Sequence, residues 1–277
     1  MTGAAISWLP RPDCGAREDN ATVVEALERD KLRNIVLLKH LEAFPDHTTV
    51  HRVERGGAAA TMVLLEVAAS AYDRRTYPTA RYAALISSDS ADLTRELVRA
   101  VPRREGVVFK LTSDADRDAV AIDFPQLRRT TAVLSFTGGP DFAHDGAVRV
   151  TTMPPEAAFV YFESQKHGRD WLEPLLRSNR AFVCVTGPDE QPHAVCFAFE
   201  NYRKVWEIGG LYTPPESRGR GYAARVVRTA LAELGTRGLS PRYQVHDDNI
   251  PSIRLAESIG LTRFLEITHF LYRPGAA

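Results

Sequence analysis

The chain has 277 residues, of which 44% are hydrophobic and 25% are charged, as expected for a globular protein with a substantial core. Its 35 basic residues balance 35 acidic ones, so no overall field would recruit nucleic acid or an anionic membrane, and any anion site must be local. Cys14, Cys184 and Cys196 form no CxxC pair and predict neither a disulfide framework nor a zinc site. The N-terminus lacks the basic start and apolar run of a signal peptide, so we expect a cytoplasmic protein with no membrane partner.

The first half alternates short strand patterns with helical ones. Hydrophobic spacing predicts helices at 23–40, 90–101 and 115–124, and strands at 49–53, 58–67, 82–87, 106–111 and 130–138. Gly138-Gly139-Pro140, continuing to Gly146, is the best candidate for a linker between two domains.

The second half repeats that order of elements. We predict helices at 171–176, 223–234 and 250–260, and strands at 181–187, 193–202, 205–213, 242–246 and 264–273. Each half therefore reads as helix, three strands, helix, strand, helix, strand. This predicts an α/β protein with a mixed sheet, built from two tandem copies of one topology at 1–140 and 147–277.

The stretch "LYTPPESRGRGYAARVV" at 211–227 places arginines and glycines in the connection between a predicted strand and a predicted helix. A helix start presents unpaired N–H groups and partial positive charge, which suit an anion. Gly219 and Gly221 permit close approach of a ligand, and Arg218 and Arg220 add charge-assisted hydrogen bonds suited to phosphate. Taken alone, the Gly-x-Gly pattern fits a diphosphate site and a solvated turn equally well, and it matches neither a P-loop nor a dinucleotide fingerprint.

Two motifs in order resolve that ambiguity. Arg218-x-x-Gly221-x-Ala223 resembles the acyl-CoA signature of GNAT-superfamily N-acetyltransferases. Further along, "NIPSIRLAESIGL" resembles the second motif of that superfamily, with Asn249, Ser252 and Leu255 at matching positions. The resemblance covers about 181–272 and is closest to the branch with glycine N-acyltransferase-like C-terminal domains.

The resemblance implies a GNAT-like acyl-CoA N-acyltransferase fold with acetyl-CoA as co-substrate and no metal. The strands at 205–213 and 242–246 would splay apart around the pantetheine arm, with a bulge at Gly209-Gly210. The residues that would bind the cofactor are Leu211, Tyr212 and Thr213 through their backbone, Arg218, Gly219, Arg220, Gly221, Tyr222 and Ala223 at the pyrophosphate, and Asn249 and Ser252 at the arm or the splay.

Transfer to an amine requires removal of a proton from the nitrogen and stabilisation of the leaving thiolate. Glu207 stands where histone-acetylating relatives carry their glutamate base, and apolar neighbours would make it a stronger base. It could instead hold the substrate's ammonium or lie on an exposed strand face. Many relatives carry a tyrosine acid after the motif leucine, but this chain has Ala256 there. Tyr212, Tyr243 and His246 are nearby in sequence, and none is assigned the role.

The first half has no equivalent glycine turn. Its counterpart, "ISSDSADLTREL" at 86–97, places Asp89 and Asp92 where a pyrophosphate would lie. Carboxylates cap helices well but repel a diphosphate, so we expect that this half does not bind the cofactor and instead shapes the acceptor pocket.

These features predict an enzyme that moves an acetyl group from acetyl-CoA to a primary amine of a small molecule or amino acid derivative. No cysteine lies near the site in sequence, so we expect direct transfer in a ternary complex, by a monomer or a homodimer with no nucleic-acid partner. The alternatives are a non-catalytic acyl-CoA binding or sensing module, an aminoacyltransferase using aminoacyl-tRNA, and plain nucleotide binding at the Arg/Gly turn.

Overall fold

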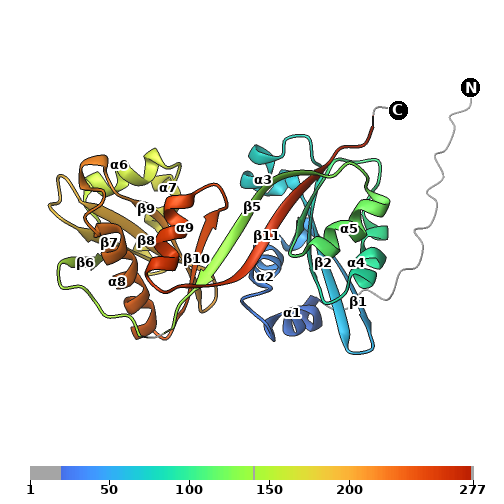
Figure 1. Cartoon of the computed structure of the whole chain (residues 1–277), viewed down its shortest axis with the longest axis horizontal. Helices are drawn as coiled ribbons and strands as arrows, with labels where there is room; N and C mark the ends of the chain where they lie inside the picture. Colours follow the sequence, from blue (N-terminus) through green and yellow to red (C-terminus); the bar gives the residue numbers. More distant parts are fainter. Residues whose placement is uncertain (1–19, 140, 276–277) are drawn as a thin grey trace, which may run out of the picture.

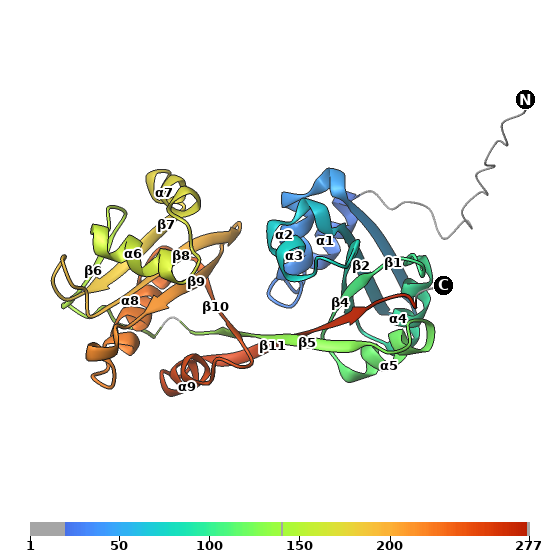
Figure 2. The same cartoon turned by 90° about the horizontal axis from the view of Figure 1, so that it is seen from above.

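The computed structural model describes residues 20–139 and 141–275. Their strands form one eleven-stranded mixed sheet in the order β1-β2-β3-β4-β11-β5-β10-β9-β8-β7-β6. The sheet and its helices make two lobes, and β5 and β11 run from one lobe to the other (Figures 1 and 2). None of the helices in these two ranges has the length and apolar character needed to cross a membrane.

The N-terminal lobe follows the predicted order, with one added helix, α3. Its elements are α1 (Asn20–Glu28), α2 (Ile35–Ala43), β1 (Thr48–Arg55), β2 (Ala58–Glu66), α3 (Ala71–Thr76), β3 (Tyr82–Ser88), α4 (Ala91–Leu97), β4 (Val107–Leu111), α5 (Asp114–Asp123) and β5 (Arg128–Thr137).

The prediction of one helix over 23–40 is wrong, because a turn at 29–34 divides it into α1 and α2. The side-chain amide of Asn34 donates to the carbonyl of Leu27 at 3.0 Å, and the carboxylate of Asp30 accepts from the backbone of Arg33 at 3.3 Å. Such local side-chain bonds compete with helix continuation. The turn sets α2 at its own angle, with its buried face on the sheet.

The C-terminal lobe also follows the predicted order and adds β6 and α6, which the sequence patterns did not reveal. Its elements are β6 (Val148–Thr151), α6 (Glu156–Ser164), α7 (Arg169–Arg177), β7 (Ala181–Thr186), β8 (Ala194–Tyr202), β9 (Val205–Tyr212), α8 (Tyr222–Thr236), β10 (Ser240–His246), α9 (Ile250–Ser258) and β11 (Thr262–Tyr272).

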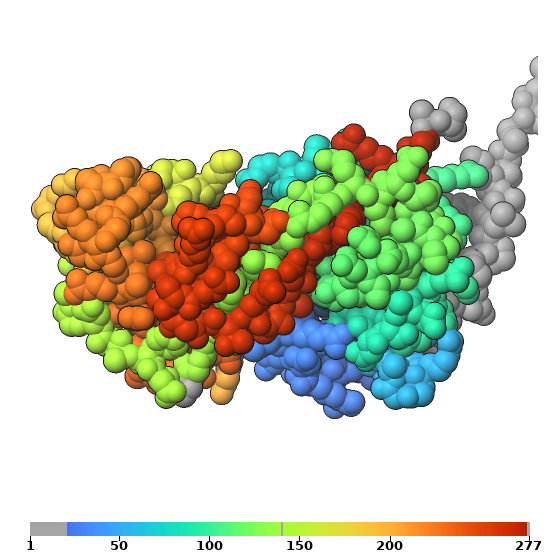
Figure 3. Space-filling model, viewed as in Figure 1, coloured from blue at the N-terminus to red at the C-terminus, as the bar shows by residue number. Residues whose placement is uncertain are grey.

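The last strand of each lobe is exchanged with the other lobe. β5 pairs antiparallel with β10, and β11 pairs antiparallel with β4, while β5 and β11 pair with each other in the middle of the sheet. The C-terminal segment, red in Figure 3, accordingly crosses from the C-terminal lobe onto the N-terminal one. The predicted linker at 138–146 is the connection from β5 to β6, and a cut there would separate each exchanged strand from its partner.

The hydrophobic cores are shared in the same way. Leu265 and Ile267 of β11 pack in the core of the N-terminal lobe, together with Tyr202 and Val205 from the β8–β9 hairpin. Leu134 and Phe136 of β5 pack in the core beneath α8. Burial of apolar area is the main driving force for folding, so the exchange makes the stability of each lobe depend on the other.

Candidate active site

The parallel pair β9 and β10 opens partway along its length. Register pairs run from Val205–Ser240 to Ile208–Tyr243, and no pair is formed beyond them, although β9 continues to Tyr212 and β10 to His246. β10 remains paired with β5 up to His246. Beyond Ile208, β9 therefore has an edge that does not pair with β10, which is the splay that the sequence motifs predicted.

The bend of β9 falls on a glycine pair. The β8–β9 register shifts between Val195 and Phe197, and Gly210 has φ +59°. A Cβ on Gly210 would lie 2.2 Å from Cε1 of Phe197, so no larger residue fits. The predicted bulge is confirmed, and the phenylalanine ring packs directly against it.

The Arg/Gly turn follows the open part of β9 and leads into α8. Gly219 and Gly221 have φ +73° and +79°, and a Cβ at either position would meet no atom within 4 Å. Gly221 is the N-cap and supplies no side-chain bond, so the first N–H groups of a 15-residue helix have no side-chain cap. Left-handed backbone, open space and an uncapped helix start together make a cradle suited to an anion.

The arginines of the turn differ in their contacts. Arg218 donates from Nε to the carbonyl of Thr213 at 3.0 Å, whereas Arg220 has no hydrogen bond or ion pair within the described ranges. Arg225 is bound to Asp145 at 2.5 and 2.9 Å, and these bonds lower the pKa of the Asp145 carboxyl to about 2. Arg225 therefore anchors the 138–147 connection to α8, and it lines a pocket of about 600 Å³ together with Arg228 and Ile259.

The second motif forms the start of α9. The side-chain oxygen of Asn249 accepts from the backbone of Ser252 at 3.3 Å, and so it caps the helix. The hydroxyl of Ser252 lies 2.5 Å from the phenolic oxygen of Tyr243, the last β10 residue that pairs with β9. Burial raises the pKa of Tyr243 to about 12, so the phenol keeps its proton at neutral pH. Ala256 is fully buried one turn further on.

The other two groups considered as acids point elsewhere. Tyr212 packs on Tyr161 with ring centroids 4.7 Å apart. His246 lies 3.2 Å from the hydroxyl of Thr131 on β5. The structure thus places one phenol, that of Tyr243, at the apex of the splay.

Glu207 lies on β9 opposite Arg242 of β10. Its Oε2 accepts from Nη1 of Arg242 at 2.8 Å and from Nδ2 of Asn201 at 2.5 Å. The guanidinium is completely buried, and its Nη2 donates to the hydroxyl of Ser135 on β5 at 3.1 Å. The expectation that the Glu207 carboxylate has apolar neighbours is therefore wrong, since it belongs to a polar cluster around a buried arginine, which no sequence motif indicates.

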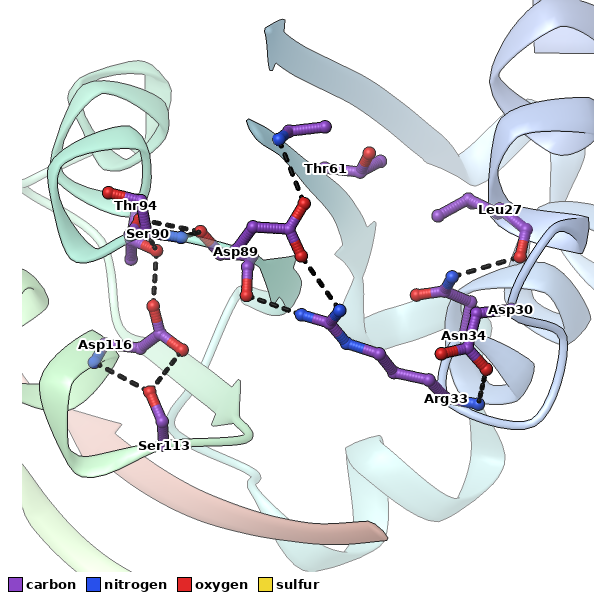
Figure 4. A network of polar contacts seen from close by, with 12 residues as sticks. Leu27, Asp30, Arg33, Asn34, Thr61, Asp89, Ser90, Thr94, Ser113 and Asp116 are labelled. Atoms are coloured by element: carbon purple, nitrogen blue, oxygen red, sulfur yellow. Dashed lines mark hydrogen bonds and ion pairs between the residues drawn. The ribbon is translucent and has the colours of Figure 1, made fainter. Parts of the chain in front are cut away.

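The equivalent turn of the N-terminal lobe is filled by its own side chains (Figure 4). Arg33 donates to the carbonyl of Ser88 at 2.6 Å and to Asp89 at 2.9 Å, and Asp89 also accepts from the backbone of Ala59. The N-cap of α4 is Ser90, whose hydroxyl accepts from the backbone N–H of Asp92. The strand end that is open in the C-terminal lobe is therefore covered here.

Comparisons with known proteins agree with this geometry. Residues 151–261 match the family model described as the acetyltransferase (GNAT) family. Residues 151–261 form a GNAT acetyltransferase domain. The family match indicates acyl transfer from an acyl-CoA. No curated protein matches the chain.

Solved structures share the fold at low identity. A GNAT-family acetyltransferase from Colwellia psychrerythraea has 13% identity and a TM-score of 0.56, with 90% of this chain and 97% of that chain covered. A GCN5-related N-acetyltransferase from Sphaerobacter thermophilus has 14% identity and a TM-score of 0.56, with coverage of 87% and 86%. A Drosophila protein has 14% identity and a TM-score of 0.58, with coverage of 94% and 98%. These likenesses show a GNAT-like fold for nearly the whole chain, and the glycine N-acyltransferase branch stays a prediction.

Within 20–139 and 141–275, no three His, Cys, Asp or Glu side chains gather so as to hold a metal ion. Cys184 and Cys196 face each other across β7 and β8 as buried free thiols, and Cys14 lies outside the described residues. The features that the sequence missed are the buried arginine at 242 and the amide at 201. Neither belongs to a motif, and only the pairing of distant strands brings them to Glu207.

Proposed function

We propose that this protein is an acetyl-CoA-dependent N-acetyltransferase that acts on a primary amine of a small molecule by direct transfer in a ternary complex. The observation that carries the proposal is the continuity of the β9–β10 splay with the open turn at the start of α8. The extended pantetheine arm of the cofactor would lie in the splay, and its diphosphate would lie at the turn.

The residues present fit this cofactor. The backbone of Leu211, Tyr212 and Thr213 offers hydrogen-bonding groups beside the unpaired part of β10, and the Thr213 hydroxyl is buried without a partner in the described structure. Buried polar groups are normally satisfied, so this hydroxyl supports a polar ligand in the splay. The turn from Arg218 to Ala223 would hold the pyrophosphate, while Asn249 and Ser252 keep α9 and Tyr243 in place.

The acetyl preference rests on the bulge. Phe197 is 1% exposed and packs on Gly209 and Gly210, where a Cβ would meet its ring at 3.0 and 2.2 Å. The ring is itself fixed by edge contacts with Phe162 and Trp171, at 5.1 and 5.7 Å between centroids. In the proposed complex this fixed ring would lie beside the acyl group and would exclude a long acyl chain.

Acetyl-CoA would supply the activated acyl group as a thioester. As the C–N bond forms and the C–S bond breaks, one proton must leave the nitrogen and one must reach the sulfur. Glu207, held by Arg242 and Asn201, is the proposed acceptor of the first proton, and the Tyr243 phenol is the proposed donor of the second. A backbone N–H near Leu211 would stabilise the carbonyl oxygen. The described cysteines are buried between β7 and β8, which supports direct transfer over an acyl-enzyme.

The test is a calorimetric titration of acetyl-CoA into wild-type protein, Gly221→Asp and the control Gly238→Asp. Gly238 also has positive φ and open space but lies beyond the far end of α8, so both variants carry similar backbone strain. An added carboxylate about 4 Å from a phosphate costs roughly 1–4 kcal/mol, so Gly221→Asp should weaken binding by about 10-fold or more. Gly238→Asp should bind as wild type does.

Release of CoA with a panel of primary amines follows in the same samples, and octanoyl-CoA serves as the long-chain comparison. Binding of acetyl-CoA without turnover of any amine would favour the alternative of a sensing module. Equal competition by ATP would favour plain nucleotide binding. No binding of acetyl-CoA to the wild-type protein would refute the proposal.

A further inference from the structure

A second cavity, of about 510 Å³, lies between the lobes. The end of α2, which faces the C-terminal lobe, forms one wall with Lys39, Glu42 and Phe44 (Figures 1 and 2). Arg180, immediately before β7, and Asn201 at the end of β8 form the other wall. Its size is that of a pocket for a small organic molecule.

Three other cations on or near this cavity have partners, and the lining carboxylate of Glu42 is exposed to solvent. Arg180 pairs with Glu200 at 2.6 Å, Arg242 with Glu207 at 2.8 Å, and Lys110 with Asp73 at 2.7 Å. Lys39, in contrast, has no hydrogen bond or ion pair within residues 20–139 and 141–275. It is half-buried, and burial lowers the pKa of its ammonium, with Glu207 as the strongest charge acting on it. A half-buried cation without a counter-ion is costly, so this position calls for an anion.

The wall opposite Lys39 carries a hydrogen-bond acceptor, the side-chain oxygen of Asn201. Asn201 donates its amide hydrogen to Glu207, which fixes the orientation of the amide, and its Oδ1 is buried without a partner in the described structure. A buried amide oxygen calls for a donor. Asn201 thus offers a hydrogen-bond acceptor on this wall next to Glu207, the proposed proton acceptor, and Lys39 forms the electropositive end.

The wall is held in place by contacts between the lobes. Tyr202, which follows Asn201, is 2% exposed and donates to the carboxylate of Glu28 on α1 at 2.7 Å. Arg203 pairs with the same carboxylate. The cavity is therefore preformed, and a ligand would not need to order it.

We infer that this cavity binds the acceptor as a free α-amino acid, with its carboxylate on Lys39 and its amino group toward Asn201 and Glu207. The inference rests on the proposed function for the fate of the amine, but the binding site stands on the cavity and its unpaired groups. It narrows the acceptor from primary amines in general to those that carry a carboxylate next to the amine.

The test compares amino acids with the amines that lack their carboxylate, and it compares a substitution of Lys39 with the same substitution of an exposed lysine. Glycine, alanine and phenylalanine, and the amines that lack their carboxylate (methylamine, ethylamine and phenethylamine), are titrated calorimetrically into wild-type protein, Lys39→Met and Lys204→Met in the presence of CoA. Lys204 is an exposed residue in the β8–β9 turn with no side-chain partner within the described ranges. Methionine keeps the length of the side chain and removes the charge.

At least one amino acid should bind wild type more tightly than its amine, and Lys39→Met should weaken that binding by about 10- to 100-fold. The control variant Lys204→Met should bind that amino acid as tightly as wild type does. Thermal unfolding without ligand should show Lys39→Met at least as stable as wild type, because the variant lacks an unpaired, half-buried charge. Equal binding of amino acids and amines, no effect of Lys39→Met, or no binding of any amino acid overturns the inference. Failure of acetyl-CoA to bind wild type refutes the proposed function instead.

Discussion

Replacing Glu207 by glutamine tests the buried pair that joins the two splayed strands. Arg242 is 0% exposed and Glu207 is 15% exposed in their side chains, at 2.8 Å from each other. Removing one partner of a buried pair typically costs about 3–5 kcal/mol of unfolding free energy, because the remaining charge is left uncompensated. Since Glu207 is partly exposed, we expect Glu207→Gln to cost about 3 kcal/mol, at the lower end of that range.

Urea unfolding followed by circular dichroism measures this cost in wild type, Glu207→Gln, Arg242→Met and the double variant. The double variant removes both charges and should recover most of the loss. Glu200→Gln on the neighbouring strand is the control, since its pair with Arg180 is more exposed and should contribute less than about 1 kcal/mol. If Glu207→Gln costs no more than this control, the reasoning about the buried pair fails.

The same variant separates two roles of Glu207 in turnover. At a temperature where Glu207→Gln is folded, a general base predicts a fall in kcat of about 100-fold or more with unchanged affinity for acetyl-CoA. A fall of less than about 10-fold would assign Glu207 to holding the substrate's ammonium, because proton transfer contributes more than that when a base is lost.

Two further predictions follow from the site and the lobe interface. Tyr243→Phe should lower kcat about 10- to 100-fold in a CoA-release assay while acetyl-CoA affinity is kept, and an unchanged kcat would contradict the role of the phenol as proton donor. Burial, aided by the Lys110 ammonium, lowers the pKa of His269 from 6.5 to about 3, so between these two pH values the unfolded state binds up to one proton more than the folded state. The unfolding free energy should therefore fall as the pH drops from 7 to 5, by up to about 1.4 kcal/mol per unit from this residue. His269→Asn should make that slope shallower, and an identical slope in urea unfolding would contradict the assignment.

The parts of the site that the sequence revealed are those where a backbone conformation demands a particular residue. The left-handed turn at Gly219 and Gly221 and the bulge at Gly210 require glycine, so the glycines in the sequence indicate these backbone conformations. The cap at Asn249 is equally local, since a side chain reaches a backbone group three residues away. Features of this kind depend on short-range geometry and carry over from sequence to structure.

The features of the site that could not be predicted from the sequence depend on residues that are far apart in the chain. Lys39 within "NIVLLKHLEAF" reads as the polar residue of an amphipathic helix, and its position in a cavity follows from the approach of β8. Arg242 reads as the start of a strand, and its side-chain partners come from β9 and β5, which lie on either side of it in the sheet. The division of the first helix at Asn34 was hidden for a different reason: one side-chain bond to Leu27 outweighs the hydrophobic periodicity.

The strand exchange explains what a lobe without the glycine turn contributes to the proposed chemistry. β10 parts from β9 after Tyr243, so its edge on that side no longer pairs with a strand. β5, from the N-terminal lobe, pairs with the opposite edge of β10 from Tyr243 to His246 and so keeps β10 extended there. The same strand supplies Ser135, which accepts from Arg242 and so helps to fix the orientation of Glu207. The N-terminal lobe thus holds the splay open and positions the proposed base, although its own corresponding turn is closed by Arg33 and Asp89.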